Sequence, residues 1–433
     1  MRHRVFIGLT EVAGYLGGLR QGFEDLGVPT LYFDGSAHPF GYARPDVLGR
    51  AGRVVDRLRD RRDAEHRLAG RTFWRAAASL ARMARAVLKL GLLSRALLTC
   101  DAFIFAGGET FFRRLDPMLL RALRKRVIVV FLGSDHRPPY LNGRWVRAMG
   151  DRELPGLLDE IRLVADRVRT AEQYANSIVA SGATAQFHVR PFIQFIAIGI
   201  PASVLPTEVG DTPRRLFSGS GVRVLHAPSD PISKGTDLIR AAVSAVRDLG
   251  YDIDYAELVR RPHADVLAAL RECDLVVDEM YSDTPMAVFS AEAAFFGKPT
   301  LVTGYYADAV GDEVRAELIP PSLFCLPHEL QDGLLRLVAD ERYREDLGRR
   351  AGAFVRARWE PAQVAQRYLR IIERDIPADW IVDPVACRYL HGWGMPDGLR
   401  RQALRAIVSR AGPDALCLTH RPDLERQLVE AAT

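Results

Sequence analysis

Residues 222–243 read VRVLHAPSDPISKGTDLIRAAV, and the order of residue types in this stretch indicates the class of fold. An apolar run is followed by a polar loop, and Lys234 and Gly235 then open a segment with helical spacing. The N-terminus of a helix presents free backbone N–H groups and a positive partial charge, both of which suit a phosphate. Lys234 can hold a diphosphate there as a compact positive charge; alternatively, Thr236 or Asp237 only caps the helix. The stretch therefore predicts a strand, a phosphate-binding loop and a helix.

Short apolar runs alternate with longer helical patterns on both sides of this stretch. Strands are predicted in the first half at residues 3–9, 29–34, 101–106 and 126–133, and in the second half at residues 222–227, 253–259, 274–279 and 300–303. Strands that alternate with helices favour parallel sheets with crossover helices. The expected class is α/β, with two Rossmann-like, doubly wound parallel-sheet domains facing each other across a cleft.

The boundary between the halves is marked by composition. Residues 201–221 are rich in Pro, Gly, Ser and Thr and lack periodicity, which is typical of a linker. We expect a first domain over residues 1–205, a second over residues 206–373, and a C-terminal helical extension over residues 374–433 that crosses back to the first domain. In open parallel sheets, ligands bind beyond the carboxyl ends of the strands, so the loops after the strands are the places to search.

Composition narrows the class of protein. The chain has 433 residues, of which 48% are hydrophobic and 26% charged, as in an average globular protein of two or three domains. No run approaches the roughly 18 apolar residues of a spanning helix, and the start MRHRVFIGLT lacks the apolar core of a signal peptide, so we expect a cytoplasmic location. The five cysteines lie far apart and never form a CxxC pair, which argues against disulfides and a zinc site.

The charge of the chain is mildly basic, +5 at pH 7, and only four of its 59 basic residues are lysines. This predominance of arginine indicates coding bias, and no nucleic-acid partner is expected. Residues 67–100 stand apart because they contain seven basic residues and no acidic one, with apolar residues largely on the other helical face. Such a helix can lie on an anionic membrane, which predicts a peripheral contact at the inner face. The alternative is a domain helix whose arginines face solvent.

A second informative stretch, residues 274–303, reads DLVVDEMYSDTPMAVFSAEAAFFGKPTLVT. A strand is followed by a polar loop and then by a helix of small and apolar residues that contains Glu292. A carboxylate in such a position usually needs a partner. It can accept hydrogen bonds from the vicinal hydroxyls of a ribose, or it can form a salt bridge or a cap.

Three motifs in this order resemble a known family: Lys234-Gly235 after a strand, the TPMAVFSAEA–FFGKP block, and the run ADERYREDLGRRAGAFVRARWEPAQVAQRYLRIIE. Together, over residues 222–373, they resemble the nucleotide-sugar domain of the retaining family-4 glycosyltransferases, which have the two-domain GT-B fold. The resemblance implies that Glu292 binds the ribose of the donor. It implies a donor-binding set of Ser229, Lys234, Gly235, Thr284, Pro285 and Glu292.

The chain departs from the family pattern at two positions. Thr284 stands where the family has an acid that contacts the transferred sugar. The neighbouring Asp283 can substitute for it, and so can Asp278 or Glu279 at the end of the preceding strand. Ser229 stands where the family usually has an arginine. Neutralisation of the diphosphate then depends on Lys234 and backbone amides, with help from an arginine of the first domain. These departures indicate a divergent subgroup.

The first domain is expected to hold the acceptor. In IGLTEVAGYLGG, Gly14, Gly17 and Gly18 follow the first strand and permit close approach of a ligand to the backbone, or they make a tight turn only. Glu11 and Glu109 each follow a strand and can meet acceptor hydroxyls or amines; solvated loop carboxylates are the alternative. These residues form the predicted acceptor side together with Asp135.

The stretch SDHR after the strand at 126–133 places Asp135 and a titratable imidazole, His136, at the expected cleft. The alternative for His136 is a structural histidine that bonds a loop carbonyl. With Lys234 and Asp283, His136 completes the predicted catalytic set.

Other reaction classes lack their motifs: GxSxG, HExxH, a Walker phosphate loop, a DxD-like metal pair and GxGxxG are absent from the required contexts. We therefore expect a glycosyltransferase of the hexosyltransferase class that needs no metal and no cofactor. It moves a sugar from a nucleotide diphosphate donor to a bacterial glycan, lipid-linked or small-molecule acceptor. Retention of the sugar's anomeric configuration is implied by the family resemblance alone. The alternatives are a same-fold enzyme that makes a non-glycosidic bond, an inactive sugar-nucleotide-binding protein, and a membrane-surface assembly factor that depends on the helix at residues 67–100.

Overall fold

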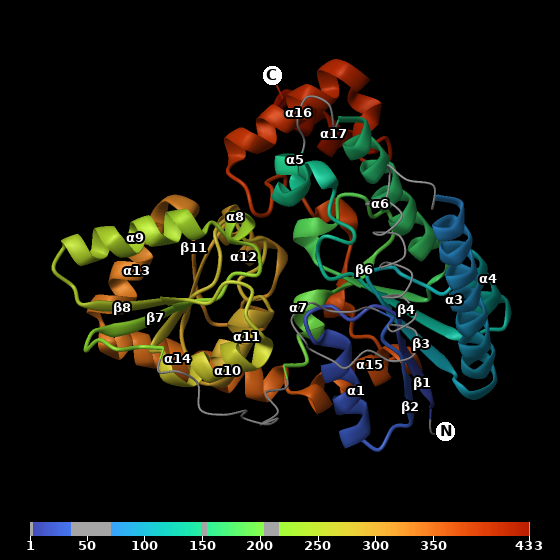
Figure 1. The fold of residues 1–433 in the computed structure, drawn as a ribbon, viewed down its shortest axis with the longest axis horizontal. Helices are drawn as coiled ribbons and strands as arrows, with labels where there is room; N and C mark the ends of the chain where they lie inside the picture. The colour runs from blue at the N-terminus through green and yellow to red at the C-terminus, as the bar shows by residue number, and fades with distance from the viewer. Residues whose placement is uncertain (1–2, 36–70, 149–153, 203–215, 433) are drawn as a thin grey trace.

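The computed structural model describes residues 3–35, 71–148, 154–202 and 216–432. Two α/β lobes lie side by side, each built on a central sheet with helices on both faces (Figure 1). The C-terminal helices, drawn in red, lie over the first lobe rather than the second.

The first domain holds a seven-stranded sheet in the order β12-β6-β5-β4-β3-β1-β2, in which only β12 is antiparallel to its neighbour. Alternate residues face opposite sides of this sheet, so Phe6 and Phe103 enter one core while Ile7 and Ile104 enter the other. The strands are β1 (Val5–Gly8), β2 (Thr30–Tyr32), β3 (Ala102–Ala106), β4 (Arg126–Val130), β5 (Ser177–Ala180), β6 (Phe192–Gln194) and β12 (Ile381–Val382).

The second domain holds a five-stranded, all-parallel sheet in the order β11-β10-β9-β7-β8. Each of the predicted strands is present in one of the two sheets, with ends that differ by a few residues. The predicted class, two parallel-sheet α/β domains, is confirmed. The strands are β7 (Val222–His226), β8 (Ile253–Glu257), β9 (Leu275–Val277), β10 (Thr300–Thr303) and β11 (Leu323–Cys325).

Helices cover both faces of the first sheet. One layer contributes Leu93, Leu120 and Leu157 to the first core, and the other contributes Leu16 and Val364 to the second. The first layer is α3 (Arg71–Thr99), α4 (Leu115–Ala122) and α6 (Leu154–Tyr174), and the second is α1 (Tyr15–Asp25), α7 (Phe195–Ile198) and α15 (Pro361–Glu373). A short helix, α5 (Gly143–Ala148), follows the loop after β4.

The second sheet is covered in the same way. Ile239 and Leu334 pack on one face, and Leu270 and Ala293 pack on the other. The helices are α8 (Pro231–Lys234), α9 (Thr236–Asp248), α10 (His263–Glu272), α11 (Val288–Phe295), α12 (Val310–Glu313), α13 (Leu330–Ala339) and α14 (Glu341–Arg358).

The chain returns to the first domain before its end. Helix α15 packs so closely on α1 that a Cβ added at Gly22 would lie 2.0 Å from the carbonyl oxygen of Pro361, and the hydroxyls of Tyr15 and Tyr368 are 2.8 Å apart. β12 then joins the edge of the first sheet, and the helices α16 (Asp397–Ala411) and α17 (Pro422–Glu430) pack on its first core. The first domain is thus built from both ends of the chain.

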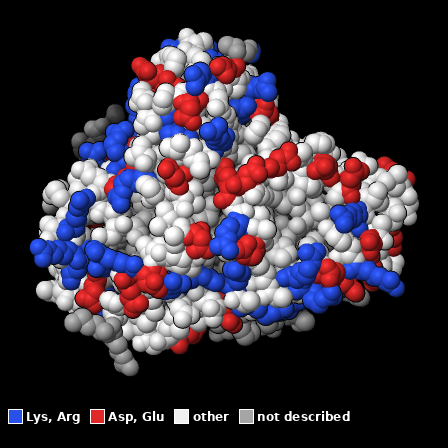
Figure 2. Space-filling view, turned by 180° about the vertical axis from the view of Figure 1, so that it is seen from behind, with Lys and Arg blue, Asp and Glu red and all other residues white. Residues whose placement is uncertain are grey.

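Two surface properties bear on partners. No helix in the described ranges is both long and apolar enough to cross a membrane. Figure 2 shows the rear face, where basic side chains are numerous along the lower half but are interspersed with acidic ones. This face therefore lacks the continuous basic surface that nucleic-acid-binding proteins use.

Candidate functional site

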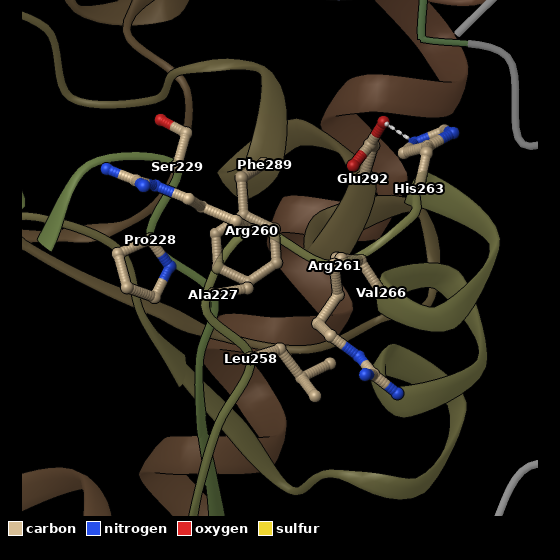
Figure 3. Close-up of a pocket in the computed structure, with 10 residues that line it drawn as sticks. All are labelled: Ala227, Pro228, Ser229, Leu258, Arg260, Arg261, His263, Val266, Phe289 and Glu292. Carbon is tan, nitrogen blue, oxygen red and sulfur yellow. Dashed lines mark hydrogen bonds and ion pairs between the residues drawn. The ribbon is translucent and has the colours of Figure 1, made fainter. Parts of the chain in front are cut away.

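A pocket lies at the carboxyl edge of the second sheet (Figure 3). Its walls come from the loops after β7 and β8 and from the first turns of α10 and α11. This is the place where open parallel sheets bind ligands. The residues that line it are Ala227, Pro228, Ser229, Leu258, Arg260, Arg261, His263, Val266, Phe289 and Glu292.

Glu292 lies on α11 at one end of the pocket, where its side chain is buried. Its Oε1 accepts a hydrogen bond from Nε2 of His263, at 2.6 Å, and His263 opens α10 (Figure 3). The carboxylate is thereby oriented by an imidazole, which leaves it suited to accept hydrogen bonds from a ligand's hydroxyls. Ribose binding by Glu292 stays a prediction.

The loops after β7 and β8 form the other end of the pocket. Ser229 is exposed there, and Arg260, whose φ is +51°, extends across the pocket toward it (Figure 3). Arg261 points in a different direction and pairs with Asp265, with Nε and Oδ2 3.3 Å apart. Neighbouring arginines on one loop thus have different environments.

Lys234, the last residue of α8, contacts two buried carboxylates at the end of β9. Its Nζ lies 3.1 Å from Oδ1 of Asp278 and also pairs with Oε2 of Glu279. Burial alone would lower the pKa of Lys234, but the two negative charges outweigh burial and raise the pKa above its usual value. Oδ2 of Asp278 accepts a further hydrogen bond from the hydroxyl of Ser290, at 2.5 Å. The ammonium is charged and mostly engaged inside the domain; diphosphate binding by Lys234 stays a prediction.

Gly235 links α8 to α9 in the left-handed region, with φ at +70°. A Cβ at this position would lie 2.6 Å from the side chain of Met280, so only glycine fits without displacement. The segment predicted as a loop before this helix contains a short helix of its own, α8. Asp230 caps α8, because its side chain accepts a hydrogen bond from the N–H of Ile232.

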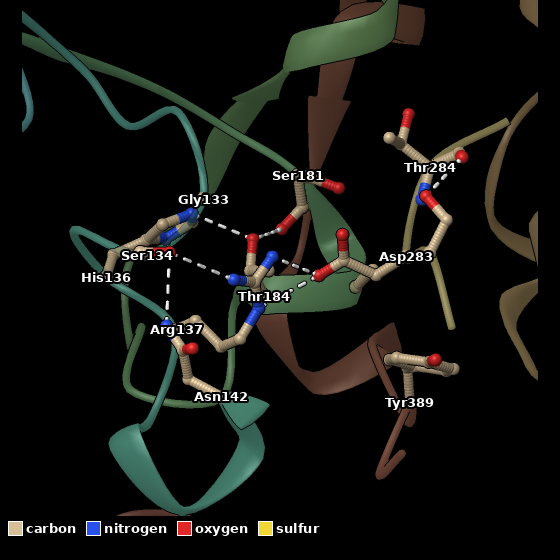
Figure 4. Close-up of polar contacts among 12 residues, drawn as sticks. Gly133, Ser134, His136, Arg137, Asn142, Ser181, Thr184, Asp283, Thr284 and Tyr389 are labelled. Carbon is tan, nitrogen blue, oxygen red and sulfur yellow. Dashed lines mark hydrogen bonds and ion pairs between the residues drawn. The ribbon is translucent and has the colours of Figure 1, made fainter. Parts of the chain in front are cut away.

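Asp283 lies where the two domains meet (Figure 4). Its Oδ2 accepts from Nε of Arg137, at 2.9 Å, and from a second guanidinium nitrogen of the same residue. Arg137 comes from the loop after β4 of the first domain and stacks over Trp393 of the C-terminal extension, at 5.3 Å. The predicted catalytic carboxylate is thus one half of a buried ion pair between the domains.

Thr284 and Pro285 follow Asp283 along the same loop. The hydroxyl of Thr284 donates to the carbonyl of Met286, at 3.3 Å, and the carbonyl of Pro285 accepts from Ser322, at 2.7 Å. Neither residue lines the pocket that holds Ser229 and Glu292. The structure therefore brings two of the predicted donor residues together in one pocket and places these two nearer the domain interface.

His136 is completely buried in the first domain. Its ring stacks on Phe131, its Nδ1 lies 3.1 Å from Nε2 of His188, and its Nε2 lies 2.7 Å from the hydroxyl of Thr184 (Figure 4). Burial, with the positive surroundings of His188 and Arg137 adding to it, holds the pKa of His136 well below its usual value. Both ring nitrogens are engaged inside the domain, which favours the structural alternative; the catalytic role stays a prediction.

The glycine-rich loop after β1 is built around Glu11. Its carboxylate accepts from the N–H groups of Leu16, at 3.1 Å, and Gly17, at 2.7 Å, and so closes the first turn of α1. Burial raises the pKa of Glu11. Gly14 takes φ at +80° where α1 begins, and Gly18 packs against the backbone of Pro201. Gly18 thus allows close packing against another segment of the same chain, not against a ligand. Acceptor binding by the residues of this loop stays a prediction.

The two remaining acceptor-side residues lie at the ends of β3 and β4. Glu109 is exposed and accepts from the hydroxyl of Thr10. Asp135 accepts from the N–H groups of Leu132 and Gly133 and so shapes the loop that carries Arg137. Burial raises the pKa of Asp135. Of the two, Glu109 is the one whose position permits contact with a ligand.

Sequence reasoning missed Arg260 and His263 in the pocket and Arg137 at the interface. A usable signal existed for the first two, because the string RRPH follows the predicted strand at 253–259 directly. The partner of Arg137 is far away in the sequence, and only the packing of the two domains brings the pair together.

The comparisons with known proteins concern the fold. No family model and no curated protein sequence matches the chain. The catalytic domain of starch synthase IV from Arabidopsis thaliana, bound to ADP and acarbose, is similar in structure, with a TM-score of 0.52, 11% identity and coverage of 86% of this chain and 99% of that one. HepE of Anabaena in complex with UDP and glucose gives a TM-score of 0.47 at 13% identity, over 86% of this chain and 100% of that one. The similarity to the starch synthase domain shows the predicted two-domain GT-B fold for this chain.

Proposed function

We propose that the chain is a glycosyltransferase that uses a nucleotide diphosphate sugar as donor. The observation that carries the proposal is the pocket at the carboxyl edge of the second sheet, where the buried carboxylate of Glu292 and the ring of Phe289 stand on α11. An aromatic ring beside a hydroxyl-binding carboxylate suits a nucleoside. The similar starch synthase, bound to ADP, supports a nucleotide in the same fold.

The first domain provides the acceptor, a bacterial glycan, a lipid-linked sugar or a small molecule, from the cleft side that includes Glu109. The acceptor's hydroxyl or amine forms a bond to the anomeric carbon of the donor sugar as the bond from that carbon to the diphosphate oxygen breaks. The nucleotide diphosphate leaves, and the acceptor's proton is released with it. Catalysis comes from positioning and from positive charge near the departing diphosphate, with water excluded between the domains. Asp283 is the carboxylate proposed to contact the transferred sugar in place of Thr284.

Retention of configuration and independence from a metal ion belong to the same proposal. Both come from the resemblance of residues 222–373 to the retaining family-4 enzymes, as does the assignment to that subgroup. Product stereochemistry, read by NMR with a defined donor, tests the first. Turnover with and without a chelator tests the second.

The first experiment is a thermal-shift screen of the protein against UDP, GDP, ADP, TDP and CDP, with and without magnesium. A nucleotide at about 100 times its dissociation constant stabilises the protein by about 2.7 kcal/mol. For domains of this size that corresponds to a rise of roughly 5–10 °C in the midpoint. One responder that does not need magnesium supports the proposal and names the base. Absence of any response, even with a candidate acceptor present, contradicts it.

A specific observation favours two other candidates. One is an enzyme of the same fold that forms a bond other than a glycosidic one, and the other is an inactive protein that binds a sugar nucleotide. Thr284 has no carboxylate, and the neighbouring Asp283 is engaged by Arg137. Incubation with the donor identified by the screen separates the candidates. The mass of a glycosylated product supports a transferase, a different coupled mass supports the second enzyme, and binding without turnover or hydrolysis supports the inactive protein.

We also propose a peripheral contact with an anionic membrane, in the cytoplasm at its inner face, through α3 and α4. Helix α3 contains basic but no acidic residues, and large apolar side chains are exposed on both helices, which adjoin in Figure 1. They are Leu80, Met83, Val87, Leu88, Leu90, Leu98, Leu115, Met118 and Leu119, with Leu123 directly after α4.

Flotation with phosphatidylglycerol vesicles tests this contact. Wild-type protein is expected to float with the vesicles. A variant with Met83, Val87 and Leu90 changed to Ser is expected to stay at the bottom of the density gradient. A matched variant with Leu249 and Val259, exposed apolar residues of the second domain, changed to Ser keeps floating. Unchanged flotation of the α3 variant removes the membrane contact from the proposal.

A further inference from the structure

The pocket at the carboxyl edge of the second sheet needs a positive charge for the ligand proposed above. A nucleoside diphosphate carries at least two negative charges, and in this fold it has to approach the loops after β7 and β8. Lys234, the lysine of the predicted donor-binding set, already contacts Asp278 and Glu279, both of which are buried. One positive charge faces two carboxylates in that cluster, so it has little attraction left for a further anion.

Arg260 is placed to supply the missing charge. It lines the pocket, its side chain is exposed, and it makes no ion pair with any residue in the described part of the chain. Its backbone is in the left-handed region, with φ at +51°, where an arginine carries a conformational cost that glycine would not. This conformation directs the guanidinium across the pocket toward Ser229 and Pro228 (Figure 3).

Its surroundings leave room for an anion at that end of the pocket. Ser229 is short and exposed, while the aromatic ring of Phe289 lies between Arg260 and the carboxylate of Glu292. A ligand that spans the pocket therefore meets a hydroxyl-binding carboxylate at one end and a guanidinium at the other. That sequence of groups matches a ribose followed by phosphates.

We infer that Arg260 forms the phosphate-binding subsite of this pocket and pairs through its guanidinium with the diphosphate of the nucleotide donor. The inference rests on the proposed function, since it presupposes a nucleotide in the pocket. A planar guanidinium can engage two phosphate oxygens through parallel N–H groups in a fixed geometry, which neither a serine hydroxyl nor the point charge of a lysine provides. Arg260 thereby holds the leaving group within the pocket, which Lys234 does not line.

The test compares Arg260→Ala with Arg261→Ala by calorimetric titration. Arg261 is the matched control, because it is exposed on the same loop but pairs with Asp265 and points elsewhere. Each protein is titrated with the nucleoside diphosphate selected by the thermal-shift screen and with the corresponding free nucleoside. In Arg260→Ala, the affinity for the diphosphate is expected to fall at least tenfold, about 1.4 kcal/mol, while the affinity for the nucleoside stays within twofold.

In Arg261→Ala, both affinities are expected to stay within twofold of the wild-type values. The inference is overturned if Arg260→Ala binds the diphosphate like the wild type, or if it loses nucleoside and diphosphate affinity equally. A wild-type protein that binds no nucleoside diphosphate overturns the proposed function itself, which is a different result from an unaffected Arg260 variant. Circular dichroism of both variants confirms that they are folded.

Discussion

The ammonium of Lys234 contacts the carboxylates of Asp278 and Glu279, and all three side chains lie inside the second domain. Replacement of Lys234 by Met leaves two buried carboxylates without a counter-charge. We expect Lys234→Met to lower the free energy of unfolding by about 3–5 kcal/mol, as for other buried pairs that lose one partner. Chemical denaturation at neutral pH measures the loss.

Two further variants make this expectation specific. Adding Glu279→Gln to Lys234→Met removes one of the orphaned charges and is expected to recover part of the stability. Lys298→Met is the control, since Lys298 makes no ion pair within the described residues and its loss is expected to change stability by less than about 1 kcal/mol. Equal stability of Lys234→Met and the wild type contradicts the ion-pair cluster. A loss of donor binding in a Lys234 variant is meaningful only after this control.

His226 lies at the end of β7 with its ring buried between two partners. Its Nδ1–H donates to the carbonyl of Val277, at 2.8 Å, and its Nε2 accepts from the hydroxyl of Thr236, at 2.9 Å. Burial lowers the pKa of His226 from 6.5 to about 4. The unfolded chain therefore takes up a proton at a higher pH than the folded protein does.

The sign of the pH dependence follows from this depression. The stability that the neutral imidazole contributes is complete above pH 6.5 and is lost as the pH falls from there toward about 4, by about 3 kcal/mol in total. We expect urea denaturation of the wild type to show this loss between about pH 7.5 and about pH 4.5. His226→Asn keeps a donor for Val277 but does not titrate, so its stability is expected to vary less. Identical pH profiles would rule out His226 as the source.

At the level of single residues, the sequence indicates some of the residues that line the pocket, but not which side chains they contact. Glu292 and Ser229 do line one pocket. The ion pairs of Lys234 and Arg137 were not predictable, because Asp278 and Asp283 lie 44 and 146 residues away and nothing in a linear pattern specifies such contacts. His136 illustrates the same limit, since its buried neighbours come from later parts of the chain.

Helix α1 shows how one element depends on its glycines. Gly18 faces the backbone at Pro201, where an added Cβ would lie 2.1 Å from the carbonyl oxygen. Gly17 is the next residue on the same helix, and there the nearest atom to an added Cβ is Oε2 of Glu11, at an ordinary contact distance of 3.4 Å. The two positions have the same residue but different space around it.

Alanine at each position gives a matched pair of outcomes. Gly18→Ala is expected to destabilise the protein by about 1–3 kcal/mol, because the helix or the segment at Pro201 must move. Gly17→Ala is expected to be neutral or to stabilise by up to about 1 kcal/mol, because alanine favours a helix and fits. Thermal denaturation of both variants measures the difference. A Gly18 variant as stable as the Gly17 variant contradicts the close packing of α1.

Whole elements are predicted best where the pattern is local. The strands at β1, β3, β4 and β7 come from apolar runs bounded by polar loops, so their residues alone indicate them. β6 has three residues and β12 only two, and each is defined by its pairing with a neighbouring strand. Pairing of this kind is a tertiary property, which is why the sequence did not predict these strands.

At the level of the whole molecule, three connections hold the domains together. α15 packs on α1, β12 joins the first sheet, and the loop at Trp393 bonds both domains. The N–H of Trp393 donates to the carbonyl of Leu141, at 2.9 Å, and the N–H of Gly394 donates to the carbonyl of Tyr281, at 3.0 Å. The C-terminal extension thus forms part of the interface where the ion pair of Arg137 and Asp283 lies.

That ion pair carries the last prediction. Its side chains are only 6% and 9% exposed, whereas the pair of Arg315 and Asp379, which also involves the C-terminal extension, is 56% and 43% exposed. A buried charge that loses its partner costs about 3–5 kcal/mol, while an exposed pair contributes less than about 1 kcal/mol. We therefore expect Arg137→Ala and Asp283→Ala each to destabilise the protein strongly, and the double variant to lose much less than the sum of the two.

A double-mutant cycle on each pair, from chemical denaturation, measures the coupling directly. Coupling above about 1.5 kcal/mol is expected for Arg137 and Asp283, and coupling near zero for Arg315 and Asp379. The pocket of Glu292 lies wholly within the second domain, so the affinity of Arg137→Ala for a nucleoside diphosphate is expected to stay within about twofold. A small coupling for the buried pair would mean that α15, β12 and the loop at Trp393 hold the domains together without it, and that Asp283 can exchange its arginine for a substrate at little cost.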